Sequence, residues 1–182
     1  MKPSEWRERL ERERKQKDWS FAVNPRSPIP PEKREDFNGL DYYPPNPVYR
    51  FKLKLHEYEE KKTLKMATTS DEEQGYIRWG EFQFKLGGKE HKLQAYSRDQ
   101  KEQWLFIPFR DATSGKETYG AGRYLDLQPG RHYLGGGRWI LDFNKAYNPF
   151  CAYNKAYSCP LTPPENWLDI LIRAGEKKYP LE

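Results

Sequence analysis

Side chains that could bind or transform a small molecule are concentrated between Trp104 and Glu165. There, short apolar runs alternate with loops rich in Arg, Asp, Asn, Tyr and Gly. Arg holds anions through charge-assisted hydrogen bonds, Tyr rings form pocket walls, and carboxylates or thiols can act as base or nucleophile. We therefore expect a ligand site between loops 110–123 and 142–166. The candidate binding residues are Arg110, Asp111, Tyr119, Arg123, Asp142, Asn144, Tyr153 and Glu165.

The leading hypothesis for this segment is a binding protein for a small polar or anionic ligand. Arg110 and Arg123 would hold the ligand by charge-assisted hydrogen bonds. Tyr119 and Tyr153 would form walls of the pocket, and Asn144 would orient the ligand. These residue types identify neither the ligand nor a cofactor.

Five of the candidates each lie at the end of a predicted strand, where the backbone is held rigidly and the loops give access. We expect these five to converge on one site. Arg–Asp pairs also serve as buried structural braces, so a purely structural interpretation stays open. The five residues are Arg110, Asp111, Arg123, Asp142 and Asn144.

An enzyme is the first alternative, in which Asp142 or Glu165 acts as base or Cys151 as nucleophile. The segments that resemble catalytic motifs are incomplete. Residues 114–117 lack the first glycine and the hydroxyl of a phosphate-binding loop, and residues 120–125 lack the third glycine of a dinucleotide fingerprint. The lack of a complete constellation favours a binding protein over an enzyme.

The chain has two cysteines, Cys151 and Cys159, separated by seven residues. We expect them to lie close together in space. Two thiolates are half of a zinc site, and no second pair or histidine at a suitable spacing completes one, so no metal site is predicted. For a cytosolic chain a reduced structural pair ranks first, a disulfide second and a catalytic thiol last.

Alternating patterns outside the loops predict a mainly β fold. Apolar residues alternate with Arg, Lys and His over residues 49–56, as in a strand with one solvent-facing side. The pair Gly87-Gly88 suits a two-residue hairpin turn. Short connections favour antiparallel pairing, so we predict a single-domain antiparallel sandwich or barrel. Later strands are predicted at residues 105–109, 123–127, 139–143 and 168–173.

The N-terminal part of the chain is expected to differ from the β domain of residues 48–182. Within residues 1–20, the run Ser4–Lys17 predicts a charged helix whose apolar stripe is only Trp6 and Leu10. We expect this helix to be solvated or docked by one aromatic edge, and dispensable for folding. Residues 21–47 form a proline-rich strap that packs on the body. A protein-interaction module that uses helix and strap is the second alternative function.

Composition limits the remaining classes. With 182 residues, 36% hydrophobic residues and 15% aromatic residues, one domain with an aromatic-rich core is expected. The net charge of +5 and the pI of 9.0 arise from 32 basic and 27 acidic residues. Because these charges are interleaved, they argue against nucleic-acid binding. No apolar run is long enough to span a membrane, so we expect a cytoplasmic protein. The oligomeric state is not predicted.

The run FRDATSGKETYGAGRYLDL, followed by LDFNKAYNPFCAYNKAYSCPLTPPENWLDI and RAGEK, resembles an uncharacterised prokaryotic family, domain of unknown function 1684. The resemblance covers about residues 37–178. It implies no particular activity, cofactor or catalytic residue. The positions to which it carries the family signature include Arg110, Asp111, Thr113, Ser114, Thr118, Tyr119, Gly122, Arg123, Asp126, Asp142, Asn144, Asn148, Cys151, Tyr153, Cys159, Glu165 and Asn166.

Overall fold

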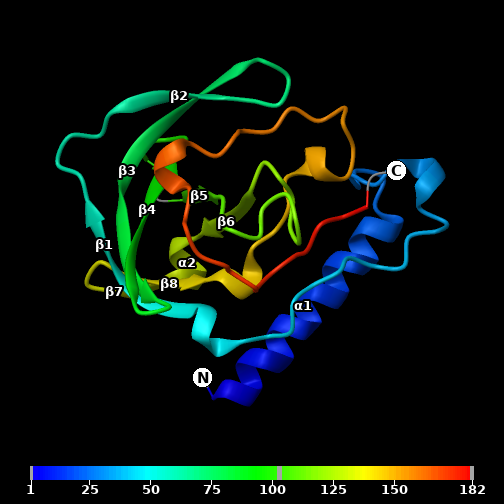
Figure 1. Ribbon diagram of the computed structural model, residues 1–182, viewed down its shortest axis with the longest axis horizontal. Coiled ribbons are helices and arrows are strands. Elements are labelled where there is room, and N and C mark those ends of the chain that lie inside the picture. Colours follow the sequence, from blue (N-terminus) through cyan, green and yellow to red (C-terminus); the bar gives the residue numbers. More distant parts are fainter. Residues whose placement is uncertain (1, 102–103, 181–182) are drawn as a thin grey trace.

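The structure of the protein, a computed structural model, describes residues 2–101 and 104–180. One antiparallel sheet curls into a half-barrel, and one long helix lies outside it (Figure 1). The predicted mainly β, single-domain antiparallel fold is therefore confirmed. The strands are β1 (Arg50–Glu57), β2 (Thr63–Ala67), β3 (Glu73–Leu86), β4 (Lys89–Ser97), β5 (Leu105–Phe109), β6 (Arg123–Leu127), β7 (Tyr133–Gly135) and β8 (Arg138–Asp142).

The strands lie in the order β6-β5-β4-β3-β1-β8-β7, and β2 pairs with β3 at one end. Strands β3 and β4 form the predicted hairpin, in which Gly87 and Gly88 have φ angles of 60° and 78°. A positive φ is unfavourable for residues that carry a side chain, which explains why glycine occupies both positions of this turn. The ladder shifts register between Arg78 and Gly80. A Cβ atom on Gly80 would lie 2.5 Å from the backbone oxygen of His56, so β1 and β3 can approach only because this residue is glycine.

The main core lies on the concave face of the sheet and contains many aromatic rings, as the composition predicts. The rings of Phe109 and Phe143 meet edge to face with centroids 5.2 Å apart, and Phe84 lies 5.5 Å from Phe143. Phe82 and Leu93, on neighbouring strands, have no exposed surface. Large rings supply much of the buried apolar area in a chain whose aliphatic content is low.

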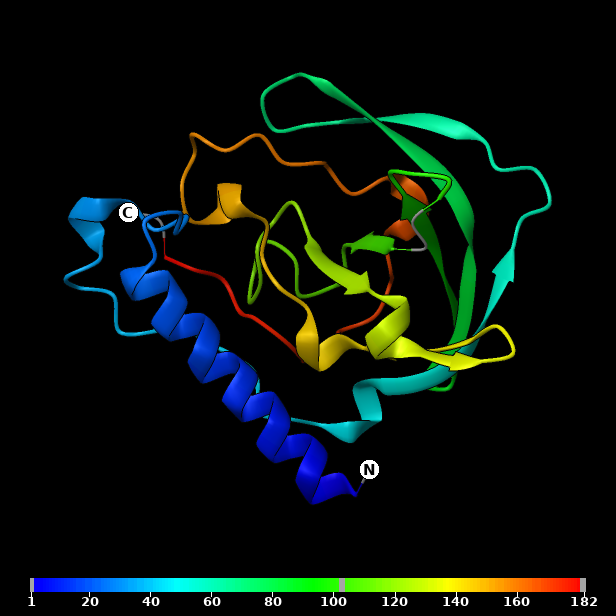
Figure 2. The ribbon, with the colours of Figure 1, turned by 180° about the vertical axis from the view of Figure 1, so that it is seen from behind.

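Helix α1 (Pro3–Val23) extends further than the predicted Ser4–Lys17, because the sequence contains no glycine or proline after Pro3 until Pro25. Lys2, rather than Ser4, is its N-cap. Trp6 and Leu10 are buried, and so is Phe21, which the shorter prediction left out. Figures 1 and 2 show that α1 lies along the C-terminal segment of the chain, on the outside of the half-barrel.

The segment 168–173 is not a strand, so this prediction was wrong. The chain bends at Asp169 and Ile170, and its pairing with residues 110–112 is incomplete. Leu168 donates to the Arg110 carbonyl at 2.8 Å, but Ile172 donates to a carboxylate oxygen of Asp111 at 2.7 Å. A side chain therefore replaces the neighbouring backbone that a ladder would need. Leu168 and Ile172 still face the core, as their spacing predicts.

Short helical turns complete the structure, and the strap between α1 and β1 packs on the body through Ile29 and Tyr43, both of which are buried. The Tyr43 N–H donates to the Gly175 carbonyl at 2.9 Å, which ties the strap to the C-terminal segment. Among the described residues, no helix combines the length and the apolarity needed to cross a membrane. The turns are η1 (Pro31–Lys33), η2 (Pro47–Tyr49), α2 (Pro129–His132), η3 (Phe143–Lys145), η4 (Phe150–Ala152) and η5 (Pro164–Asn166).

Candidate functional site

Arg123, at the start of β6, lies in a closed polar cluster with the C-terminal segment. Its guanidinium donates to the carbonyls of Ala174, Glu176 (3.1 Å) and Ile172 (2.9 Å), and to Asp111 at 3.3 Å. The Arg123 and Asp111 side chains are both 0% exposed. Burial lowers the pKa of Arg123, and the Asp111 carboxylate opposes that shift. With four protein acceptors and no exposed surface, this arginine acts as a brace for the chain end.

Asp111 is equally occupied. Its carboxylate accepts the Thr113 hydroxyl at 2.8 Å and the Ile172 N–H at 2.7 Å, in addition to Arg123. The Thr113 hydroxyl in turn lies 2.8 Å from that of Thr118, so the turn after β5 is held together by its own side chains. The Asp111 carboxylate and both hydroxyls are buried, so they are not accessible to a ligand.

Asp142 and Asn144, at the end of β8, form a second and separate cluster. The indole N–H of Trp6 donates to Asp142 at 2.8 Å, and the Asn144 side chain donates to it at 2.9 Å. Asn144 also pairs with the backbone of Asn46 in both directions, each bond being 2.8 Å. Arg50 completes the cluster at 3.4 Å from Asp142. These contacts fix α1 and the strap to the sheet.

Two predicted wall residues, Tyr119 and Tyr153, have different surroundings. Tyr153 is buried, and its hydroxyl donates to the carboxylate of Glu176. Burial raises the pKa of Tyr153 well above its usual value. The Tyr119 hydroxyl lies 3.6 Å from the sulfur of Cys151. Among the described residues, no hydrogen bond links either tyrosine to Asp142 or to the other tyrosine.

Arg110 and Glu165 lie elsewhere again. The Arg110 guanidinium stacks on the ring of Trp167, 4.5 Å from its centroid. Glu165 accepts the Tyr96 hydroxyl at 2.7 Å and pairs with Arg78. The structure thus joins Asp111 to Arg123 and Asp142 to Asn144. Among the described residues, no side-chain hydrogen bond or ion pair links these two pairs to each other or to the Arg110 guanidinium.

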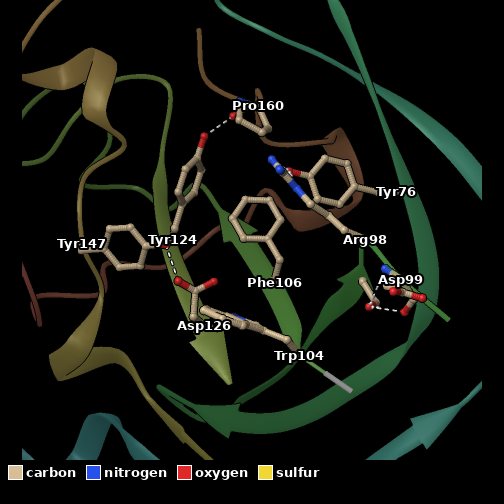
Figure 3. Close-up of a pocket in the computed structure, with 10 residues that line it drawn as sticks. Tyr76, Arg98, Asp99, Trp104, Phe106, Tyr124, Asp126, Tyr147 and Pro160 are labelled. Atoms are coloured by element: carbon tan, nitrogen blue, oxygen red, sulfur yellow. Dashed lines mark hydrogen bonds between the residues drawn. The ribbon is translucent and has the colours of Figure 1, made fainter. Parts of the chain in front are cut away.

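A different set of side chains encloses a cavity of 360 Å³ between β3, β5, β6 and the loop after η3 (Figure 3). Five aromatic rings form most of its wall, and Arg98, Asp99 and Asp126 add charge. Pro160 closes one side, where its carbonyl accepts the Tyr124 hydroxyl. The five rings belong to Tyr76, Trp104, Phe106, Tyr124 and Tyr147. We call this cavity the aromatic pocket.

Strand pairing positions the aromatic pocket. Tyr124 and Asp126 share one side of β6 because side chains two residues apart in a strand point the same way. Phe106 is the register partner of Asp126 on β5, and its ring lies 4.7 Å from that of Tyr124 and 5.4 Å from that of Tyr76. Tyr147 is held at the pocket by its backbone. The Tyr124 N–H donates to the Tyr147 carbonyl at 2.9 Å, and the Tyr147 N–H donates to the Tyr124 carbonyl at 3.1 Å.

Of the three charged residues that line the pocket, Arg98 and Asp99 lie on one side and Asp126 on the other (Figure 3). Asp126 accepts the Tyr147 hydroxyl. Burial raises the pKa of Asp126, and hydrogen bonds from Tyr147 and Trp104 partly oppose this shift. Arg98 donates to the Tyr76 hydroxyl at 2.9 Å and lies 5.2 Å from the centroid of that ring. Within the described residues, Asp126 has no ion-pair partner within 4.0 Å.

None of the eight predicted binding residues lines the aromatic pocket. The signal that was available is the pair Tyr124 and Asp126, whose spacing of two places an acid beside a ring on one strand face. Arg98 and Trp104 carry no such signal, because only the β4-β5 pairing brings them to β6. In the part of the chain that the structure describes, no group of three or more His, Cys, Asp and Glu side chains could hold a metal ion.

Comparisons with known proteins agree with the resemblance in the sequence. The solution NMR structure of an uncharacterized protein from Haloarcula marismortui is similar to this chain, with a TM-score of 0.74 and 40% sequence identity. The similarity covers 96% of this chain and 95% of that chain. None of the curated proteins matches. The family model described as "Protein of unknown function (DUF1684)" matches residues 35–177, and the chain therefore belongs to that family.

Proposed function

We propose that the protein binds a small, flat, amphoteric molecule in the aromatic pocket. A cationic or hydrogen-bond-donating group of the ligand would meet Asp126, and an acidic group would meet Arg98. The ring of the ligand would lie among Phe106, Tyr124 and Tyr147. The sequence predicted a small polar or anionic ligand between loops 110–123 and 142–166; this proposal keeps a small polar ligand but places it in the aromatic pocket and adds a cationic group.

The observation that carries the proposal is the state of Asp126. It is a half-buried carboxylate set among aromatic rings, and among the described residues it accepts the Tyr147 hydroxyl but has no ion pair. A carboxylate shielded from solvent is costly to ionise without an opposite charge in contact with it, and a cationic group of a ligand would supply that charge. Aromatic faces also attract cations, so the surroundings favour the same chemistry.

Size and the second charge support an amphoteric ligand. The cavity of 360 Å³ lies within the range of about 300–1,000 Å³ that small-molecule pockets occupy. Arg98 is exposed on its outer side, while Tyr76 and Gln74 hold its Nη2 atom at 2.9 and 2.8 Å. The guanidinium is thus oriented, and among the described residues its Nη1 atom makes no hydrogen bond, which suits a carboxylate of the ligand.

Thermal melts with three compound sets test this proposal: aromatic amino acids, aromatic amines without an acid, and aromatic acids without an amine. We expect the amphoteric set to raise Tm most, since a ligand at 100 times its Kd stabilises by about 2.7 kcal/mol. Trp104→Ala and Asp126→Asn should each abolish that rise. Trp167→Ala, which removes another exposed tryptophan outside the pocket, is the matched control. A rise that survives Trp104→Ala and Asp126→Asn would contradict the proposal, as would no rise at all.

Acid–base catalysis at the same carboxylate is the second candidate function. The raised pKa of Asp126 favours it, because groups that transfer protons near neutral pH are often shifted by burial. Turnover of a bound compound, lost in Asp126→Asn with binding retained, would distinguish an enzyme from a binding protein. We also propose a cytoplasmic location, which the free Cys151 and Cys159 support because reduced cysteines are typical of the cytosol.

A further inference from the structure

Two free cysteines lie side by side outside the aromatic pocket. Cys151 is in η4 and Cys159 follows in the same loop, and their exposed fractions are 4% and 7%. The backbone N–H of Cys151 donates to the sulfur of Cys159 at 3.3 Å. The expectation that the two residues are close in space is therefore confirmed, and no disulfide joins them in the structure.

Hydrogen bonds fix the backbone around both cysteines from two directions. Thr69, in the loop after β2, accepts the Cys159 N–H at 3.1 Å with its hydroxyl, and its own N–H donates to the Cys159 carbonyl at 3.0 Å. On the other side, the Ala152 N–H donates to the Pro149 carbonyl at 2.9 Å, which closes the turn around Cys151. These bonds keep the two cysteines next to each other, as an intramolecular disulfide requires.

The two thiols are chemically unequal. The Tyr119 hydroxyl lies 3.6 Å from the Cys151 sulfur and can donate to it. The pKa of Cys151 is lowered by hydrogen bonds from Cys159, Tyr119 and Thr69 to its thiolate, against the effect of burial. The pKa of Cys159 is raised by the same neighbour, because a thiolate at Cys151 disfavours a second one. One sulfur is thus suited to attack, and the other to resolve the product.

We propose that Cys151 and Cys159 form a peroxide-reactive dithiol that closes to an intramolecular disulfide. The Cys151 thiolate attacks one oxygen of hydrogen peroxide, the O–O bond breaks, and the leaving hydroxide takes up a proton to become water. Cys151 is then a sulfenic acid. The Cys159 thiol loses its proton and attacks the Cys151 sulfur, the S–O bond breaks, and the second water leaves. In total, two thiols give up two electrons to one peroxide and form one disulfide and two waters.

This inference does not depend on the proposed ligand site, and wild-type protein tests it without any variant. The intact chain is treated with a small excess of hydrogen peroxide, and its titratable thiols and its mass are followed over time. We expect both thiols to disappear together and the monomer to lose the mass of two hydrogen atoms, reversibly with a dithiol reductant. If both thiols persist while the same thiols in denatured chain are oxidised, or if covalent dimers form instead, the proposal is wrong.

Serine variants test which of the two sulfurs reacts first with peroxide. Cys159→Ser should accumulate a sulfenic acid at Cys151 that a dimedone probe traps, whereas Cys151→Ser should react at least about tenfold more slowly with peroxide. Tyr119→Phe should slow the wild-type reaction severalfold, with Tyr133→Phe, on the distant β7, as the matched control. Equal rates for the two serine variants, or trapping at Cys159 rather than Cys151, would overturn the assignment.

Discussion

Arg123→Ala is expected to destabilise the protein strongly, although Arg123 was a candidate for holding a ligand. The side chain is 0% exposed and donates to three carbonyls of the C-terminal segment and to Asp111. Its removal leaves the Asp111 carboxylate buried without its cation. Breaking one partner from a buried ion pair costs about 3–5 kcal/mol. At about 2–4 °C per kcal/mol for a chain of this size, Tm should fall by roughly 6–20 °C.

Chemical denaturation of the ligand-free protein measures this loss as a shift of the unfolding midpoint. Arg173→Ala is the matched control, because Arg173 also pairs with a carboxylate, that of Glu117 at 2.8 Å, but in solvent. An exposed pair is screened, so this variant should unfold almost as the wild type does. If Arg123→Ala loses no more stability than Arg173→Ala, the brace is not the main role of Arg123, and a ligand-holding role becomes the better explanation.

Three further perturbations follow from the structure. Burial raises the pKa of Asp126, so protonated Asp126 stabilises the folded state at low pH, and this stability is lost as pH rises through the raised pKa. The Tm of Asp126→Asn should therefore increase relative to that of the wild type as pH rises. A difference in Tm that does not change with pH would contradict this. Deleting residues 1–17 should leave a cooperative but weaker denaturant transition, since α1 lies outside the main β core, and an insoluble or molten product would show that the helix is essential. Gly80→Ala should lower the free energy of unfolding by about 1–3 kcal/mol in the same assay, because its Cβ atom would meet the backbone of His56. Gly75→Ala, with open space around it, should not lower it. Equal losses would exclude the steric explanation.

Strand periodicity predicted most of the sheet because it depends only on neighbours along the chain. The hairpin at Gly87-Gly88 and the strands at 105–109 and 123–127 lie where the alternation places them. The segment 168–173 has the same alternation without being a strand. Asp111, a residue far away in sequence, accepts its backbone N–H, and no local pattern carries that information.

The site was harder to predict because residue type does not reveal burial. Arg123 and Asp111 were predicted to lie together, and they do, but as a closed brace. Convergence with Asp142 assumed that all strand ends share one site. Strands β6 and β8 do come into contact across the curl of the sheet, but Arg123 is held by Asp111 and the C-terminal segment, and Asp142 by Trp6 and Asn144. The aromatic pocket depends on pairing between β5 and β6, which brings Phe106 opposite Asp126, and sheet topology could not be deduced from the sequence.

The most direct test of the central claim is a map of where a ligand binds. Uniformly labelled protein is titrated with an aromatic amino acid, and the backbone amide shifts are followed by NMR. We predict that the largest changes occur at Tyr124, Asp126 and Tyr147 and saturate together. Changes confined to loop 110–119 and Asn144, or no saturable change with any amphoteric aromatic compound, would contradict the aromatic pocket as the ligand site.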